Sequence, residues 1–164
     1  MTIKIITGDI TELNCDAIVN AANSNLLAGG GVCGAIHNAA GQSLERVCKE
    51  IGGCETGDAV ITRGFDLKAK FVIHAVGPRW WDGTRNEAEL LKNCYKRIFE
   101  IVRDNNIKSV AIPAISTGIY RFPLEQATEI AIKIAQENDS ENLEIIFTCF
   151  GDDVAEVYKN TLNK

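Results

Sequence analysis

Three segments carry the residues whose types and spacing suggest chemistry. They are residues 8–10, residues 20–34 and residues 116–120. Each follows an apolar run of the kind that forms a buried strand. In open α/β sheets, ligands bind beyond the carboxyl ends of the strands, so we expect the three segments to share one site.

The second segment contains Gly29, Gly30 and Gly31, directly before a helical pattern that begins at Val32. Glycine lacks a Cβ, so the backbone can approach a ligand closely. The free N–H groups and the positive dipole end of the helix then point at whatever the loop encloses. The glycines match neither a Walker A nor a G-x-G-x-x-G fingerprint. The pattern predicts an anion site that a pyrophosphate would fit, and the alternative is an ordinary flexible surface loop.

The other two segments suggest the rest of a nucleotide site. Between Ser116 and Tyr120, small residues leave backbone N–H groups free to face the same phosphates. Tyr120 could cover a sugar or be a half-buried aromatic with its hydroxyl in water. Asp9 could accept a hydrogen bond from an exocyclic amine, or serve ordinary turn chemistry. Taken together, these residues favour a nucleotide-like anion.

Composition and charge narrow the class of partner. The chain has 164 residues, of which 46% are hydrophobic and 24% charged, and we expect one globular domain over residues 1–164. Seventeen Lys and Arg against 22 Asp and Glu give a net charge of −5, without a basic cluster. A groove for duplex DNA is therefore not expected. Backbone N–H groups and helix ends would have to hold any phosphate.

The six cysteines are scattered and include no CxxC pair; they are Cys15, Cys33, Cys48, Cys54, Cys94 and Cys149. The first nine residues are typical of a strand and turn rather than a signal peptide. No apolar run approaches the roughly 20 residues that a membrane span needs. We therefore expect reduced thiols, no membrane partner and a cytoplasmic location.

Strands and helices alternate along the chain. Apolar runs predict strands at residues 3–7, 17–19, 59–62, 71–76, 110–112 and 143–149. Helical spacing predicts helices at residues 32–40, 43–51 and 87–104, a fourth opened by Pro123, and a fifth at the end of the chain. Continuous apolar strands are typical of a sheet covered by helices on both faces. The fold class is therefore predicted to be an α/β sandwich.

Four motifs carry a resemblance to a known family: residues 8–11, 16–23, 29–37 and 113–118. In this order and spacing they resemble the macrodomain family, specifically its MacroD-like branch, over essentially the whole chain. The resemblance implies a three-layer α/β/α sandwich around a six-stranded mixed sheet. It also implies a cleft for ADP-ribose.

The resemblance implies a role for each residue at the two ends of that ligand. Asp9 resembles the carboxylate that accepts from the adenine amino group, with the backbone of Ile10 beside it. Phe150 resembles the aromatic that packs on the adenine. Asn23 resembles the residue that fixes the distal ribose by its hydroxyls. Tyr120 lies where the family often places an aromatic over that ribose.

Between these ends, the resemblance implies two walls of a pyrophosphate site. One wall consists of Gly30, Gly31 and Val32. The other consists of Ser116, Thr117, Gly118 and Ile119. Both walls are glycine-containing loops, in keeping with the anion site predicted from the glycine run.

Cys33 departs from the family pattern, because active MacroD-like proteins commonly carry Asp at this position. That Asp is credited with orienting or activating the attacking water. Some viral macrodomains that resemble the branch lack the Asp and are still credited with hydrolysis, with a water held against the ligand's phosphate. A thiol near a helix N-terminus is itself a candidate nucleophile, although a nearby pyrophosphate disfavours the thiolate.

A metal site is not expected from this sequence. Cys33 and His37 have the i, i+4 spacing that lets two side chains reach one zinc ion. The only other histidine is His74, at the end of a distant predicted strand, where a core histidine is the simpler interpretation. We expect His37 to pack or to form a hydrogen bond, and we expect neither metal nor cofactor.

The resemblance implies a hydrolase that cleaves mono-ADP-ribosyl esters on Asp or Glu of proteins, and O-acetyl-ADP-ribose. Its partners would be ADP-ribose or ADP-ribosylated proteins, and we expect a monomer. The alternative is a non-catalytic reader of ADP-ribose, because Cys33 replaces the usual Asp. A binder of single-stranded nucleic acid or poly-ADP-ribose is disfavoured by the acidic charge. Trp80 and Trp81 either contact a partner or cap the fold.

Overall fold

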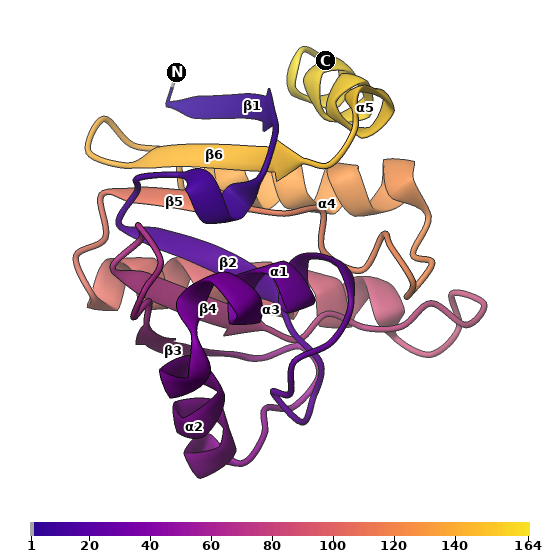
Figure 1. Cartoon of the computed structure of the whole chain (residues 1–164). Coiled ribbons are helices and arrows are strands. Elements are labelled where there is room, and N and C mark those ends of the chain that lie inside the picture. Colours follow the sequence, from indigo (N-terminus) through magenta and orange to yellow (C-terminus); the bar gives the residue numbers. More distant parts are fainter. Residues whose placement is uncertain (1) are drawn as a thin grey trace.

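The computed structural model describes residues 2–164 and contains one six-stranded sheet in the order β1-β6-β5-β2-β4-β3 (Figure 1). Its strands are β1 (Ile3–Thr7), β2 (Ala17–Ala21), β3 (Ala59–Arg63), β4 (Phe71–Ala75), β5 (Ser109–Ile112) and β6 (Glu144–Cys149). All neighbours run parallel except β3, which is antiparallel to β4. The sheet is therefore mixed, as the resemblance implies.

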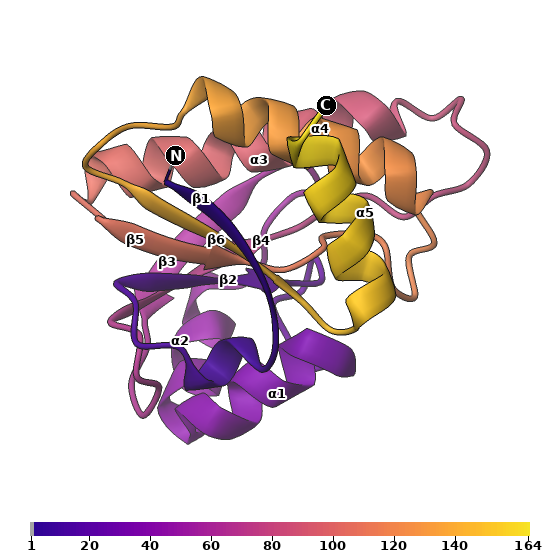
Figure 2. The ribbon, with the colours of Figure 1, turned by 90° about the horizontal axis from the view of Figure 1, so that it is seen from above.

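The helices form a layer on each face of the sheet. They are α1 (Gly31–Ala40), α2 (Gln42–Ile51), α3 (Glu87–Asp104), α4 (Leu124–Glu137) and α5 (Asp152–Leu162), with one short 3₁₀ turn, η1 (Ile10–Glu12). Figure 2 shows α1 and α2 on one side of the sheet and α3, α4 and α5 on the other. The predicted three-layer α/β/α sandwich is confirmed. Over residues 2–164, no helix combines the length and apolar character needed to span a membrane.

Alternate residues along the strands belong to two separate hydrophobic clusters, one on each face of the sheet. Val19 and Ile73 pack in the cluster that includes α3, α4 and α5. Their neighbours Ile18 and Val72 point the other way, into the cluster that includes α1 and α2. Side chains alternate across a sheet, and helices cover both of its faces, so both faces of these strands are buried. This explains why the strands are continuous apolar runs in the sequence.

The second strand is longer than the sequence predicts. The predicted strand ends at residue 19, but β2 continues through Ala21, and Asn20 is opposite His74 of β4. The Asn20 side chain is fully buried, and its Nδ2 lies 3.1 Å from His74 Nδ1. This contact satisfies the amide nitrogen of Asn20 inside a core strand, while Oδ1 has no hydrogen-bond partner among the described residues.

His74 is a satisfied core histidine, as expected. Its Nε2 lies 2.9 Å from Thr62 Oγ1, and its other ring nitrogen, Nδ1, lies within hydrogen-bond distance of the Asn20 amide. Burial, with a smaller contribution from the nearby His37, lowers the pKa of His74 to about 4. Both effects disfavour the charged imidazolium. His74 is therefore neutral in the folded protein at pH 7.

The free energy of unfolding is expected to fall as the pH drops below about 6.5, the unfolded-state pKa of histidine. Below that pH the unfolded chain takes up a proton that folded His74 accepts only near its pKa of about 4. Between pH 7 and pH 5 the loss attributable to His74 is about 2 kcal/mol. Denaturant titrations of the wild type and of His74→Phe at both pH values measure it. An equally steep decline in the variant would assign the effect to other groups.

Candidate functional site

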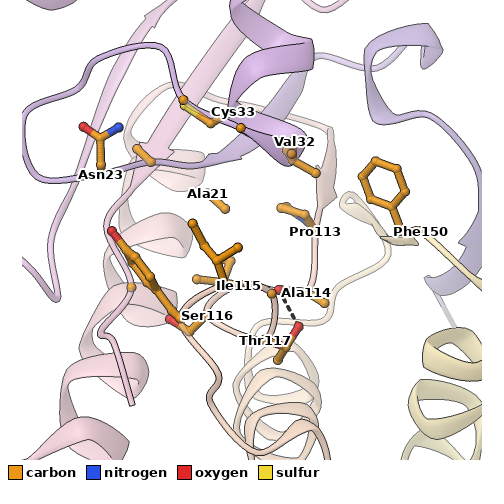
Figure 3. Close-up of a pocket in the computed structure, with 18 of the residues that line it drawn as sticks. Ala21, Asn23, Val32, Cys33, Pro113, Ala114, Ile115, Ser116, Thr117 and Phe150 are labelled. Atoms are coloured by element: carbon orange, nitrogen blue, oxygen red, sulfur yellow. Dashed lines mark hydrogen bonds between the residues drawn. The ribbon is translucent and has the colours of Figure 1, made fainter. Parts of the chain in front are cut away.

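A cavity of about 430 Å³ opens at the carboxyl ends of the central strands (Figure 3). Its walls come from the end of β2, the loop before α1, the loop after β5, and the end of β6. The expectation that loops at this edge share one site is therefore met for two of the three segments. The lining residues are Ala21, Ala22, Asn23, Gly29 to Cys33, Gly77, Pro113 to Tyr120, Thr148, Phe150 and Val154.

The remaining segment borders a small adjoining recess. Asp9 and Ile10 line this recess, which shares Val32, Pro113, Thr148 and Phe150 with the main cavity. Every residue that the resemblance assigned to the ligand therefore lies at the cavity or the recess beside it.

One wall is the N-terminus of α1. Gly30 is the N-cap residue, and the helix begins at Gly31. The first N–H groups of a helix have no intrahelical acceptor, so those of Gly31, Val32 and Cys33 are available to a ligand. The glycine loop lies directly on this helix: a Cβ at Gly34 would stand 2.3 Å from the Gly29 carbonyl oxygen. Only glycine at position 34 permits this approach.

The opposite wall is the loop after β5. Ser116 has a φ of +67°, an uncommon value for a residue with a side chain. A Cβ at Gly77 would lie 2.3 Å from Ser116 Oγ, which shows that this turn packs tightly on the segment after β4. The Thr117 hydroxyl donates to the Ala114 carbonyl at 2.9 Å. In residues 2–164 the N–H groups of Gly118 and Ile119 meet no acceptor, so they too are available.

The cavity has no charged side chain among its described lining residues. Two loops instead present backbone N–H groups, one of them at a helix N-terminus with the positive end of its dipole. Such an arrangement binds an anion without lysine or arginine. This agrees with the expectation, drawn from the acidic composition, that backbone groups hold any phosphate.

The ends of the cavity differ in chemistry. Figure 3 shows Phe150 at one end and Asn23 at the other. Phe150 is 75% exposed and Ile119, on the second wall, is 86% exposed. Both side chains line the cavity and are exposed there, so an apolar part of a ligand could cover them. The Phe150 end therefore suits a flat apolar group and the Asn23 end a polar one.

The Asn23 side chain is fixed by its own loop. Its Oδ1 accepts the Leu27 N–H at 3.0 Å, and its Nδ2 donates to the Leu27 carbonyl at 2.8 Å. These two bonds set the orientation of the amide. An amide has two donor hydrogens and two acceptor lone pairs, so one of each remains for a ligand. Asn23 is thus a pre-oriented polar group.

Cys33 contacts the same loop residue from the other side. It is 6% exposed, its thiol donates to the Leu27 carbonyl at 3.4 Å, and Asn20 Nδ2 lies 3.8 Å from its sulfur. A Cβ at Gly29 would lie 3.7 Å from Asn23 Nδ2 and 4.0 Å from Cys33 Sγ. The two side chains therefore flank Gly29, and Cys33 helps hold the loop.

Asp9 caps the turn η1, as one of its two interpretations predicted. Its Oδ1 accepts the N–H of Thr11 at 2.9 Å and the Thr11 hydroxyl at 2.7 Å. Within the described residues, Oδ2 receives no hydrogen bond. The cap therefore orients the carboxylate and leaves one oxygen for a ligand, so the two interpretations are compatible.

The His37 side chain packs, and neither of its ring nitrogens forms a hydrogen bond with any residue from 2 to 164. Its ring lies 6.4 Å from that of His74, centre to centre, and burial lowers its pKa. Of the two expected roles, packing is the one observed. In the same part of the chain no three His, Cys, Asp or Glu side chains gather as a metal site, and all six cysteines are free thiols.

Three lining residues were missed by the sequence reasoning. Gly77 follows β4, and its place just after a strand was a signal that could have found it. Thr148 lies inside β6, with a buried hydroxyl that has no partner among the described residues. Val154 belongs to α5 and has the spacing of a core residue. Nothing in the sequence distinguishes either from its neighbours.

Comparison with known proteins identifies the family. The Macro domain model matches residues 19–131. A macro domain-containing protein of Mesorhizobium japonicum is 51% identical over 95% of this chain and 90% of its own length. One from Chlorobaculum tepidum is 51% identical, covering 98% and 95%.

Solved structures agree in fold. A variant of the Oceanobacillus iheyensis macrodomain with ADP-ribose superposes with a TM-score of 0.92 and 37% identity, over 97% of this chain and 90% of that one. The Trypanosoma brucei macrodomain in complex with ADP-ribose gives 0.88 and 38%, over 97% and 68%. By its sequence match and its fold, this chain belongs to the macro domain family.

Proposed function

We propose that the cavity binds ADP-ribose and that the protein hydrolyses esters on its distal ribose. The observation that carries the proposal is the pair of loops that present unpaired backbone N–H groups to an uncharged cavity, between Phe150 and Asn23. ADP-ribose matches this order of groups: an aromatic base, a pyrophosphate and a polar sugar. Related macrodomains have been solved with ADP-ribose or ADP.

The adenine would lie at the Phe150 end. The exposed Phe150 ring offers an apolar face for the base. Asp9, in the adjoining recess, is oriented by its hydrogen bonds to Thr11. Its other carboxylate oxygen is left to accept a hydrogen bond from the adenine amino group. The backbone of Ile10 lies beside it. The pyrophosphate would then lie between the two walls, where the dipole of α1 favours negative charge.

The distal ribose would lie at the Asn23 end, under Tyr120. A pre-oriented amide can hold the ribose hydroxyls and so place the ester for attack. The oxygen of a water molecule then bonds to the acyl carbon, the bond from that carbon to the ribose oxygen breaks, and the ribose oxygen takes up a proton. The products are ADP-ribose and a free carboxylic acid.

No carboxylate or imidazole lines the cavity in the described chain, so the side chains that most often serve as general bases are absent from its lining. We propose the ligand's own phosphate as the acceptor for the water proton. We assign Cys33 a positioning role, because its thiol donates to the Leu27 carbonyl and so helps to hold the loop that also carries Asn23.

The same observation supports a second candidate, a reader that binds ADP-ribose without turnover. A protein carrying a mono-ADP-ribosyl ester on Asp or Glu separates the two. Incubated with a small amount of this chain, the substrate should release free ADP-ribose and the unmodified protein. Stoichiometric binding with no released ADP-ribose would establish the reader instead.

Cys33→Asp is expected to raise hydrolysis of O-acetyl-ADP-ribose about 10-fold or more. A carboxylate beside Asn23 could accept a proton from water, and general-base work commonly contributes 10²- to 10⁴-fold. It would also lose the bond to the Leu27 carbonyl and turn away from that oxygen. Cys33→Ala should stay within a few-fold of the wild type. An inactive Cys33→Ala protein that still binds ADP-ribose would make the thiol a participant.

A further inference from the structure

The loop that precedes α3 is anchored by one buried carboxylate. Oε2 of Glu87 accepts backbone N–H groups at 2.9–3.2 Å, and Oε1 accepts another at 2.6 Å; the donors are Trp81, Asp82, Gly83 and Arg85. Burial alone would raise the pKa of Glu87, but these hydrogen bonds outweigh it and lower the pKa to about 2. The ionised carboxylate therefore holds the loop in one shape.

This loop displays an aromatic ring with two arginines over it. The Arg85 guanidinium lies 4.5 Å from the centre of the Trp81 ring, and that of Arg79 lies 5.7 Å away. Trp81 itself is 56% exposed. We call Arg79, Trp81 and Arg85 the arginine–tryptophan cluster. Cation–π contact restrains the arginines, so they are presented to solvent in a defined position.

The cluster adjoins the cavity at Tyr120. Arg79 lies 5.6 Å from the centre of the Tyr120 ring, and the Trp80 N–H donates to the Tyr120 carbonyl at 2.8 Å. Tyr120 is a lining residue of the cavity. A molecule that protrudes from the cavity at this end would therefore meet the cluster.

The two guanidinium groups have no carboxylate partner in the described part of the chain. The carboxylates of Asp82 and Glu87 form their hydrogen bonds with other groups. Glu87 binds backbone N–H groups, and Oδ1 of Asp82 accepts the N–H and the hydroxyl of Thr84. No ion pair occupies the N–H donors of Arg79 and Arg85 in the described part of the chain, although the Asp82 carboxylate is near enough to Arg85 for that charge to add to the Thr84 hydrogen bonds in lowering the pKa of Asp82.

We propose that the arginine–tryptophan cluster binds acidic side chains of the polypeptide that carries the ADP-ribosyl group. This rests on the proposed function, in which Tyr120 covers the distal ribose, the point where that polypeptide is attached. The planar guanidinium fork matches a carboxylate in charge and geometry. Because the arginines already lie over the Trp81 ring, a carboxylate partner is favoured over a stacked nucleobase.

The test compares two peptides joined to ADP-ribose by a linkage that is not an ester, so that neither is consumed. One has Asp and Glu beside the attachment point, and the other has Asn and Gln there. The wild type should bind the acidic conjugate about 5-fold more tightly, the magnitude expected for one or two exposed ion pairs. The difference should shrink at high salt.

Arg85→Glu should remove this preference, and Arg85→Gln should reduce it. Arg46→Glu, the same change on the exposed surface of α2, is the matched control and should keep it. All these proteins should bind free ADP-ribose equally, which also shows that each variant is folded.

Equal binding of the two conjugates by the wild type would overturn the inference, as would an Arg85→Glu variant that keeps the preference. Tighter binding of an ADP-ribosylated oligonucleotide than of the acidic peptide would overturn it in favour of nucleic acid. Failure of the proposed ADP-ribose site is distinct, because free ADP-ribose would then not bind at all, and a chain that binds without hydrolysis would still show or lack the preference between conjugates.

Discussion

Gly30→Glu is expected to abolish ADP-ribose binding. A Cβ at Gly30 meets no atom within 4 Å, and the residue lines the cavity, so the new side chain would occupy the phosphate path without disturbing the fold. Like charges about 4 Å apart repel by roughly 4 kcal/mol at a protein surface. Together with the lost space, this predicts an affinity loss of more than about 100-fold. Isothermal titration calorimetry with ADP-ribose measures it.

Two control variants show whether the negative charge or the size of the new side chain weakens binding, and whether an added charge elsewhere has the same effect. Gly30→Gln adds a side chain of equal size without the charge and should weaken binding less. Ser43→Glu adds the same charge near the N-terminus of α2, where a helix tolerates it, and should bind normally. Unchanged affinity in Gly30→Glu would show that the pyrophosphate does not lie against the glycine wall.

Asn23→Ala is expected to reduce turnover much more than affinity. The adenine and pyrophosphate contacts would remain, while the distal ribose would lose the amide that orients it. A misplacement of about 1 Å at a reacting group can lower the rate about 100-fold. The rate of O-acetyl-ADP-ribose hydrolysis at saturating substrate and the dissociation constant of ADP-ribose give the two effects.

ADP provides the control for this variant, because it lacks the distal ribose. Asn23 also holds Leu27, so its removal could loosen the loop that carries the glycines. If the loop keeps its shape, ADP binds the variant and the wild type equally. Equal losses in ADP-ribose affinity and in rate would instead make Asn23 an ordinary binding residue.

The fold was predictable from the sequence because its strands and helices are strongly patterned. The helix over residues 87–104 has its predicted bounds, and the strand at residues 3–7 does too. Asn20 shows where the pattern fails: a polar residue ends a predicted strand, yet here His74 pairs with it across the sheet. Such a partner is 54 residues away in the sequence, so local patterning cannot reveal it.

The two loops that form the walls of the candidate site were also predictable from local sequence patterns. Glycine runs and strand ends indicate where backbone can face a ligand, and both walls of the cavity came from them. The fixing of Asn23 and Cys33 on Leu27 was not predictable, because it depends on the path of the loop. The anchoring of Trp81 by Glu87 likewise follows from tertiary packing, although both residues lie in one short segment.

The most direct test of hydrolysis is a time course of ADP-ribose release from O-acetyl-ADP-ribose in excess over the protein. We expect many molecules of ADP-ribose per protein molecule in the wild type, with none above the uncatalysed background in Gly30→Glu. Tight binding of ADP-ribose by the wild type, with release no faster than that background, would contradict the hydrolase and leave a reader.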